Sequence, residues 1–139
     1  MPTNNFVNKP KLSINNLPEK GMKQHDFIND FKQYYVHLLG RDENLQLPFY
    51  EGKALSLAIR DRLMDRWKVT HQTYKNYDCR RGYYLSMEYL IGRTLSNAML
   101  NLGVTDTVTQ AMYDLGIEIE ELITSEHDAG LGNGGLGRL

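Results

Sequence analysis

Cysteine and long apolar runs are what this sequence has least of. Cys79 is the only cysteine among 139 residues, which excludes a disulfide framework and suits a reducing compartment. No apolar run approaches the roughly 20 residues of a membrane helix, and the first residues lack the apolar centre of a signal peptide. No two of the four histidines have the spacing of metal ligands. We therefore expect a cytoplasmic protein without a metal site.

Charge of either sign is not in excess. The 16 Lys and Arg residues and the 17 Asp and Glu residues leave a formal net charge of -1, so no global field attracts nucleic acid or an anionic membrane. Hydrophobic residues make up 41% of the chain and charged residues 24%, which is near the average of a soluble globular domain. A chain of this length and composition can bury a core.

Residues 1–21 are rich in Asn, Pro and Lys, and their apolar residues follow no steady period. We interpret them as a flexible tail that precedes a folded region over residues 22–139. Ser13 lies in this tail near Lys9 and Lys11, where a solvated serine is favoured over a phosphorylation switch.

Two apolar patterns predict helices in the first half of the chain. Residues 22–40 place apolar side chains at steps of three and four and end at Gly40 (Phe27, Phe31, Tyr34, Tyr35 and Leu38). Residues 49–76 predict one long helix with an apolar residue at every fourth position (Leu55, Ile59, Leu63 and Trp67). We interpret the charged residues between them as a solvated, self-paired helix surface (Arg60, Asp61, Arg62, Asp65 and Arg66).

The apolar run of residues 82–91 favours a strand that is buried on both faces. Glu88 interrupts this run, and a buried carboxylate requires a partner. Three interpretations of Glu88 stay open: a site role, a helix-capping carboxylate, or an exposed strand end.

Short helices are predicted to follow that strand. Thr94 is expected to cap the first of them, and Gly103 to end it. Thr107 and Gln110 suggest a capping box for a second helix, which ends at Gly116. Residues 115–123 indicate a third short helix with an acidic outer face.

Glycine is concentrated in the last ten residues, GLGNGGLGRL. Gly130, Gly132 and Gly135 fit the dinucleotide fingerprint GxGxxG, but TSEHDA stands where that motif needs an apolar strand. A phosphate loop of the form GxxxxGK[ST] is rejected, because Arg138 and Leu139 replace its lysine and hydroxyl residues. Two interpretations stay open. One is an anion-binding loop ahead of a helix, and the other is a tight turn between packed elements.

Four stretches together resemble the glycogen (α-1,4-glucan) phosphorylase family: RDRLMDRW, YYLSMEYLIGRTLSN, YDLGIEIEEL and DAGLGNGGLGRL. They occur in the family's order, and the resemblance runs from about Phe27 to the last residue. It implies an α/β fold class, as the helix-rich N-terminal portion of a two-domain, Rossmann-like (GT-B) glycosyltransferase. It also implies a homodimeric enzyme with pyridoxal 5'-phosphate as cofactor. In such an enzyme, orthophosphate cleaves the terminal glucose of an α-1,4-glucan to give glucose 1-phosphate.

The resemblance implies roles for individual residues of the glycine loop. The backbone N–H groups of Gly135 and Leu136 would meet sugar and phosphate, while Asn133 and Gly134 would shape the approach to them. Glu88 resembles a carboxylate that braces this loop. The lysine that binds the cofactor would lie outside this chain.

The resemblance also extends to a region at the dimer edge where regulated animal enzymes bind AMP. Asp42 and Gln72 match that region, whereas His71 and Lys75 depart from it. Lys75 stands where an aromatic residue stacks on the adenine, which argues against ordinary AMP activation.

We expect the chain to be a truncated part of such an enzyme that is inert and poorly folded by itself. The long helix would then expose its core face, and the strand around Tyr84 would have no sheet to join. Two other classes stay open. One is a small nucleotide- or phosphate-binding module that uses the glycine loop, and the other is a helical dimerisation module that uses residues 27–39.

Overall fold

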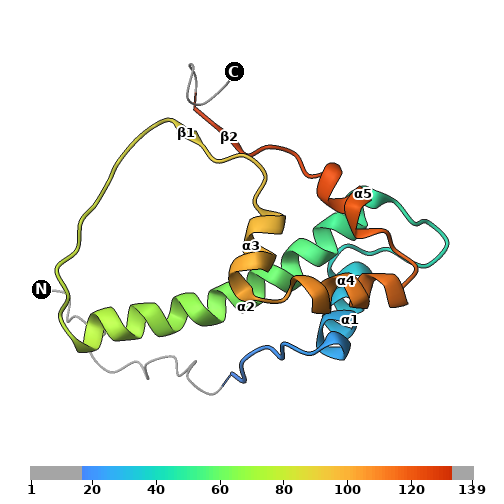
Figure 1. Ribbon diagram of the computed structural model, residues 1–139, viewed down its shortest axis with the longest axis horizontal. Helices are drawn as coiled ribbons and strands as arrows, with labels where there is room; N and C mark the ends of the chain where they lie inside the picture. The colour runs from blue at the N-terminus through green and yellow to red at the C-terminus, as the bar shows by residue number, and fades with distance from the viewer. Residues whose placement is uncertain (1–16, 133–139) are drawn as a thin grey trace, which may run out of the picture.

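Helix α2 (Pro48–Asn76) is the longest helix of the structure. The structure is a computed structural model that describes residues 17–132. Helix α1 (Gln24–Gln33), a π-helical turn η1 (Tyr34–Leu38) and three later helices gather around the first half of α2 (Figure 1). The later helices are α3 (Leu95–Leu102), α4 (Thr105–Asp114) and α5 (Ile119–Thr124). Two short strands, β1 (Tyr89–Leu90) and β2 (Gly130–Leu131), pair with each other beyond α3. The described part is helix-rich, as the sequence predicts.

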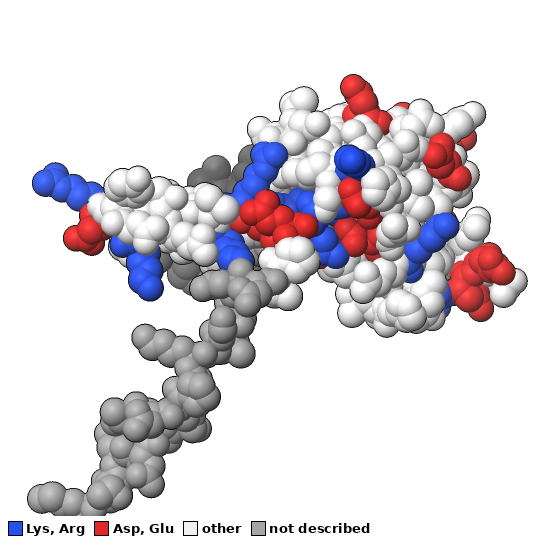
Figure 2. Space-filling view, turned by 90° about the horizontal axis from the view of Figure 1, so that it is seen from below, with Lys and Arg blue, Asp and Glu red and all other residues white. Residues whose placement is uncertain are grey.

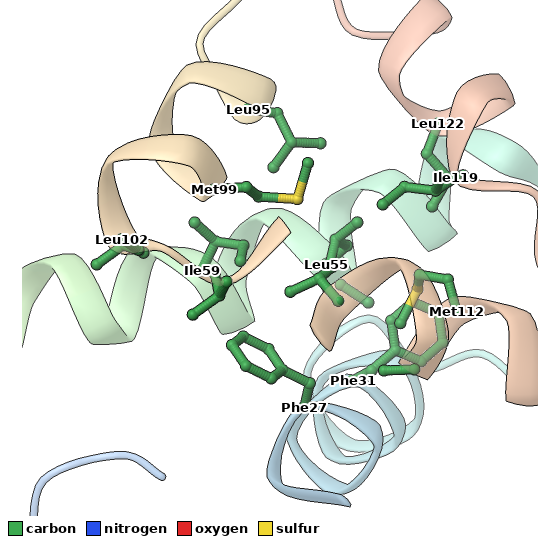
Figure 3. Packing of buried hydrophobic residues seen from close by; sticks show 14 of the residues in the cluster. Phe27, Phe31, Leu55, Ile59, Leu95, Met99, Leu102, Met112, Ile119 and Leu122 are labelled. Carbon is green, nitrogen blue, oxygen red and sulfur yellow. The ribbon is translucent and has the colours of Figure 1, made fainter. Parts of the chain in front are cut away.

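Leu55 and Ile59 of α2 lie at the centre of the hydrophobic core (Figure 3). Phe27 approaches them from α1, Met99 from α3 and Met112 from α4. Each of these five side chains is no more than 2% exposed. Full burial of one such side chain contributes about 1.5–3 kcal/mol, so this cluster holds the helices around the first half of α2.

The predicted apolar face of residues 22–40 is largely confirmed. Phe27, Phe31 and Tyr35 are buried, but Leu38 is 61% exposed, so its predicted place on that face is wrong. The cause is the π-helical turn, in which the N–H of Leu39 donates to the carbonyl of Tyr34 at 2.9 Å. An i→i+5 bond widens the turn and rotates the following residues away from the α-helical stripe.

The long helix is confirmed, but its apolar stripe is buried only at its beginning. Leu55 and Ile59 are enclosed, Leu63 is half-buried, and Trp67 is 56% exposed. Arg66 still donates to the carbonyls of Asn101 and Leu102 in α3, but beyond it α2 extends away from the core, and no described helix packs there (Figure 1). The expected exposure of a core face is therefore confined to that part of α2.

Arg62 corrects the prediction of a solvated, self-paired surface on α2, because it is 1% exposed. Its Nη1 lies 3.0 Å from the Asp30 carboxylate of α1 and donates to the Ala58 carbonyl at 2.7 Å. Its Nε donates to the Gly21 carbonyl at 2.8 Å. The guanidinium also lies 3.7 Å from the centroid of the Phe27 ring. The side chain is buried because α1 and the preceding residues cover it.

Lys20 and Gly21, which the sequence assigns to the flexible tail, are held against α1 and α2. The Lys20 ammonium lies 2.8 Å from the Asp30 carboxylate, and this hydrogen bond raises the pKa of Lys20. The backbone N–H of Lys20 donates to Asp65 at 2.8 Å. The earlier part of the predicted tail, residues 1–16, lies outside the described residues.

The short helices occur near their predicted places, but two of them begin elsewhere, since α5 starts at Ile119 and residues 115–118 are not helical. Gly103 ends α3 with φ = 70°, and α5 buries Ile119 while its acidic side chains face outward. The predicted capping box at Thr107 is wrong, because α4 begins at Thr105 with Val104 as its N-cap. Val104 and Val108 are both buried, and this apolar anchor sets the start of the helix three residues earlier.

The predicted buried strand over residues 82–91 is wrong for this chain. Only Tyr89–Leu90 is a strand, and Tyr83, Leu85 and Met87 are 81%, 92% and 92% exposed. An apolar run of this kind is buried only when a sheet and covering helices surround it. Among the described residues, only the two-residue β2 pairs with it.

The surface shows basic and acidic side chains intermixed on the face seen in Figure 2. Within residues 17–132, no helix combines the length and the apolar character that crossing a membrane requires. The same range contains no group of three or more His, Cys, Asp or Glu residues that is placed to hold a metal ion.

Candidate functional site

The pairing of β1 with β2 brings Glu88 against the beginning of the glycine loop. Leu90 is opposite Gly130 in the antiparallel register, and two positions further on Gly132 faces Glu88. A Cβ atom on Gly132 would lie 2.8 Å from the Cα and 2.9 Å from the Cγ of Glu88. Gly132 has φ = 108°, a conformation that side chains disfavour. Glycine is therefore required at position 132 both by the close approach of Glu88 and by the positive φ.

Glu88 itself is half-buried and lies directly before β1, rather than inside a buried strand. The Ser86 hydroxyl accepts a hydrogen bond from the Glu88 N–H at 3.1 Å and donates to the Glu88 carbonyl at 2.8 Å. The Glu88 carboxylate accepts no hydrogen bond from any residue in the range 17–132. Of the three interpretations of Glu88, the strand end agrees with this position, and the site role stays a prediction.

The four predicted substrate-facing residues lie outside the described residues (Asn133, Gly134, Gly135 and Leu136). The described residues do show what precedes them. Residues 125–129 form no strand, whereas a dinucleotide fingerprint needs an apolar strand at that place. The local context thus gives no support to a dinucleotide site.

Glu126 has a position in this region that the sequence did not reveal. Its carboxylate accepts hydrogen bonds from the backbone N–H of Thr94 at 2.8 Å and of Leu95 at 3.1 Å. It therefore caps α3 from a different segment, and the Thr94 hydroxyl makes no such cap. Thr94 is an acceptable N-cap residue type, so nothing in the sequence signalled that another acceptor was needed.

The predicted nucleotide region is not assembled within one copy of the chain. Asp42 lines a cavity of about 570 Å³ at the beginning of α2, together with Glu51 and Arg41. His71 lies on α2, twenty residues beyond Glu51, which corresponds to about 30 Å at 1.5 Å per residue.

Gln72 and Lys75 are also exposed on the distal part of α2. The ring of His71 lies against that of Trp67, with 3.8 Å between the centroids. These residues share one helix end, and Asp42 lies near the other end. An AMP site that includes all four would need contributions from two copies.

A pyridoxal 5'-phosphate group needs a lysine in an enclosed site that can form a Schiff base. Lys20 is engaged by Asp30, and Lys68 is only half-buried on α2. The other described lysines are exposed (Lys23, Lys32, Lys53 and Lys75). The described residues do not fit this cofactor, so we derive no step through it.

The helix face proposed for dimerisation is already used within the chain. Phe27, Phe31 and Tyr35 are 0%, 5% and 8% exposed because they pack against α2 and α4. The described structure therefore gives no support to dimerisation through this face.

No protein-family model matches the chain. Among curated proteins, glycogen phosphorylase, brain form, of Homo sapiens is 41% identical over 141 residues, which cover 99% of this chain and 16% of that protein. The muscle form of Rattus norvegicus is 46% identical over 114 residues, covering 82% of this chain and 14% of that protein. The brain form of Rattus norvegicus is 47% identical over 109 residues, covering 78% of this chain and 13% of that protein.

These three relatives are all named glycogen phosphorylase, and the first of the similarities covers nearly the whole chain. The chain belongs to the glycogen phosphorylase family. It spans 16% of the length of the human brain form, so the activity, substrates and partners of those larger proteins come to it only as proposals.

Proposed function

We propose that this chain supplies the glycine loop and its support to an α-1,4-glucan phosphorylase. In that reaction, orthophosphate cleaves the terminal α-1,4-linked glucose of glycogen, starch or maltodextrin to give glucose 1-phosphate. The observation that supports the proposal most directly is the contact between Gly132 and Glu88. It brings the loop-bracing carboxylate that the resemblance implies to the beginning of the loop.

The physical role of the loop follows from backbone chemistry. A glycine-rich segment lets the amides of Gly135 and Leu136 approach a sugar or a phosphate closely, because no side chains intervene. Preorganised N–H groups stabilise an oxyanion without reorganisation during the reaction. Asn133 and Gly134 would shape that approach, and Glu88 would fix the direction in which the loop leaves β2.

The proposal includes the rest of the enzyme that the resemblance implies. The chain would be the helix-rich beginning of a two-domain GT-B architecture in a cytoplasmic homodimer, and inactive by itself. Pyridoxal 5'-phosphate and its lysine would belong to a part of the enzyme outside this chain. The exposed side chains of Tyr83, Tyr84, Leu85 and Met87 are consistent with a strand that joins a sheet formed with that part.

The test is a chimera in which this chain replaces the matching 141-residue stretch of the human brain form. We expect the chimera to release glucose 1-phosphate from glycogen and orthophosphate. A folded, dimeric chimera without this activity would contradict the proposed function.

The bracing role of Glu88 is tested separately in the same chimera. Glu88→Gln is expected to lower turnover by about tenfold to a hundredfold, because small displacements of a positioned group have effects of that size. The matched control is Glu118→Gln, an exposed glutamate before α5, which should leave turnover unchanged. Unchanged turnover in Glu88→Gln would exclude the bracing role.

A further inference from the structure

Residues 88–95 and residues 126–132 run antiparallel and contact each other over a longer stretch than the strand pair. We call this pair of segments the zipper. At one end Gly132 lies against Glu88, and β1 pairs with β2 over the next two positions. Beyond the strands, Arg93 lies 3.7 Å from Asp128. At the far end Glu126 binds the first N–H groups of α3. The contacts thus extend from one end of the zipper to the other, although the backbone ladder is limited to β1 and β2.

The hydrogen bonds of Glu126 are the strongest set in this zipper. One carboxylate oxygen accepts from the N–H groups of Thr94 and Leu95 at 2.8 and 3.1 Å, and the other accepts from Leu95 at 3.1 Å. Hydrogen bonds to an ionised acceptor are stronger than neutral ones. The negative charge also lies at the N-terminus of α3, where the helix dipole favours it.

The remaining contacts of the zipper are weak by comparison. A two-residue ladder is not stable in isolation, and a slip of one position would turn every side chain to the opposite face. The side chains of Arg93 and Asp128 are 53% and 72% exposed, and exposed ion pairs contribute little. The register of residues 126–132, which lead into the glycine loop, therefore depends on the hydrogen bonds of Glu126.

We infer that Glu126 is a positioning residue for the glycine loop. It fixes residues 126–132 to α3, whose residues Leu95 and Met99 are buried in the core. The glycine loop is thereby held in a fixed position relative to the helical core. At the other end of the zipper, Glu88 orients the loop. This inference rests on the proposed function for its catalytic consequence, whereas the zipper itself is tested without it.

The first experiment measures hydrogen exchange in the 139-residue chain. Glu126→Ala should accelerate exchange of the Thr94 and Leu95 amides and also of the backbone amides that pair Tyr89 with Leu131 in β1 and β2. Glu126→Gln should lie between the original chain and Glu126→Ala, because its amide oxygen can accept from both N–H groups but carries no charge. Faster exchange limited to Thr94 and Leu95 would overturn the inference, because the cap would then act only on α3.

The second experiment measures kinetics in the chimera with the human brain form. Glu126→Ala should raise the KM for orthophosphate by about tenfold at an unchanged melting temperature, and Glu126→Gln, which keeps an acceptor oxygen without the charge, should show a smaller rise. Glu120→Ala, an exposed carboxylate of α5, is the matched control. A lower melting temperature with an unchanged KM would show a merely structural role and overturn the inference. An inactive unsubstituted chimera would contradict the proposed function, while the exchange experiment still decides the inference.

Discussion

The guanidinium of Arg62 lies 3.0 Å from the carboxylate of Asp30, and the Arg62 side chain is fully enclosed between α1 and α2. Asp30 also accepts a hydrogen bond from Lys20, so it has two cationic partners. Arg62 has one carboxylate partner, and its Nη2 atom is buried without any hydrogen-bond partner among the described residues. Arg62 therefore depends on Asp30 for charge compensation more than Asp30 depends on Arg62.

Removal of Asp30 is expected to destabilise the chain more than removal of Arg62. Asp30→Ala leaves the buried Arg62 guanidinium uncompensated, which costs about 3 kcal/mol in the free energy of unfolding. Arg62→Met leaves Asp30 paired with Lys20 and keeps an apolar side chain over Phe27, so its cost should be clearly smaller. Denaturant titration followed by circular dichroism measures both. The exposed Arg60→Ala is the control, with a change within about 0.5 kcal/mol.

The same pair shows where sequence analysis succeeds on this fold and where it does not. The apolar periods of α1 and α2 correctly predict the helices and the core residues Phe27 and Leu55, because periodicity reflects local burial. Arg62 lies on the buried stripe of α2, three residues after Ile59 and seven after Leu55, so its position in the period agrees with burial. Its charge led to the surface assignment, because the sequence does not show that Asp30 of α1 supplies a partner for it.

The candidate site likewise contains residues that the sequence reveals and one residue that it does not. Its glycines and Glu88 can be singled out from the sequence, since a carboxylate in an apolar run and dense glycine are both unusual. Glu126 could not be identified, because its partners are backbone N–H groups of Leu95 and Thr94, thirty-one and thirty-two positions away. The apolar run around Tyr84 by itself predicts burial, whereas the exposure of Tyr84 agrees with the expectation that this strand has no sheet to join within the chain.

Glu51 should make the stability of the chain depend on pH. Burial, and secondarily the charge of Glu121, raise the pKa of Glu51 above its ordinary value of 4.5. Below that value both the folded and the unfolded states hold the proton, and Glu51 has no effect. As the pH rises above it, the unfolded state loses the proton first and is favoured.

Glu51→Gln should therefore stabilise the chain at pH 7 and have little effect below pH 4.5. We expect a melting temperature higher by roughly 2–5 °C at pH 7. Thermal melts followed by circular dichroism across this pH range provide the measurement. The exposed Glu118→Gln should show no such trend, and a Glu51→Gln effect that is equal at all pH values would refute the explanation.

Limited proteolysis should begin between α2 and β1. Tyr83, Tyr84 and Leu85 are 81%, 81% and 92% exposed and belong to no helix or strand. Chymotrypsin should cut the isolated chain there first, while the core around Phe27 resists, because cleavage follows local exposure. In the chimera the same segment should be protected. Early cleavage inside α1 or α4 would instead show that the isolated chain lacks a stable core.

Gly132→Ala tests the close approach of the glycine loop to Glu88. The added Cβ would lie 2.7 Å from the backbone oxygen of Met87 and 2.8 Å from the Cα of Glu88, and neither atom can swing away as a side chain can. The φ of 108° adds backbone strain.

We therefore expect Gly132→Ala to displace the loop and lower kcat/KM of the chimera by about a hundredfold. Its melting temperature should change little, since Gly132 directly follows β2, which lies away from the helical core (Figure 1). Gly82→Ala is the matched control, because a Cβ there meets nothing within 4 Å. Full activity of Gly132→Ala would mean that the loop does not need its contact with Glu88, because the two segments would have separated without consequence for the reaction.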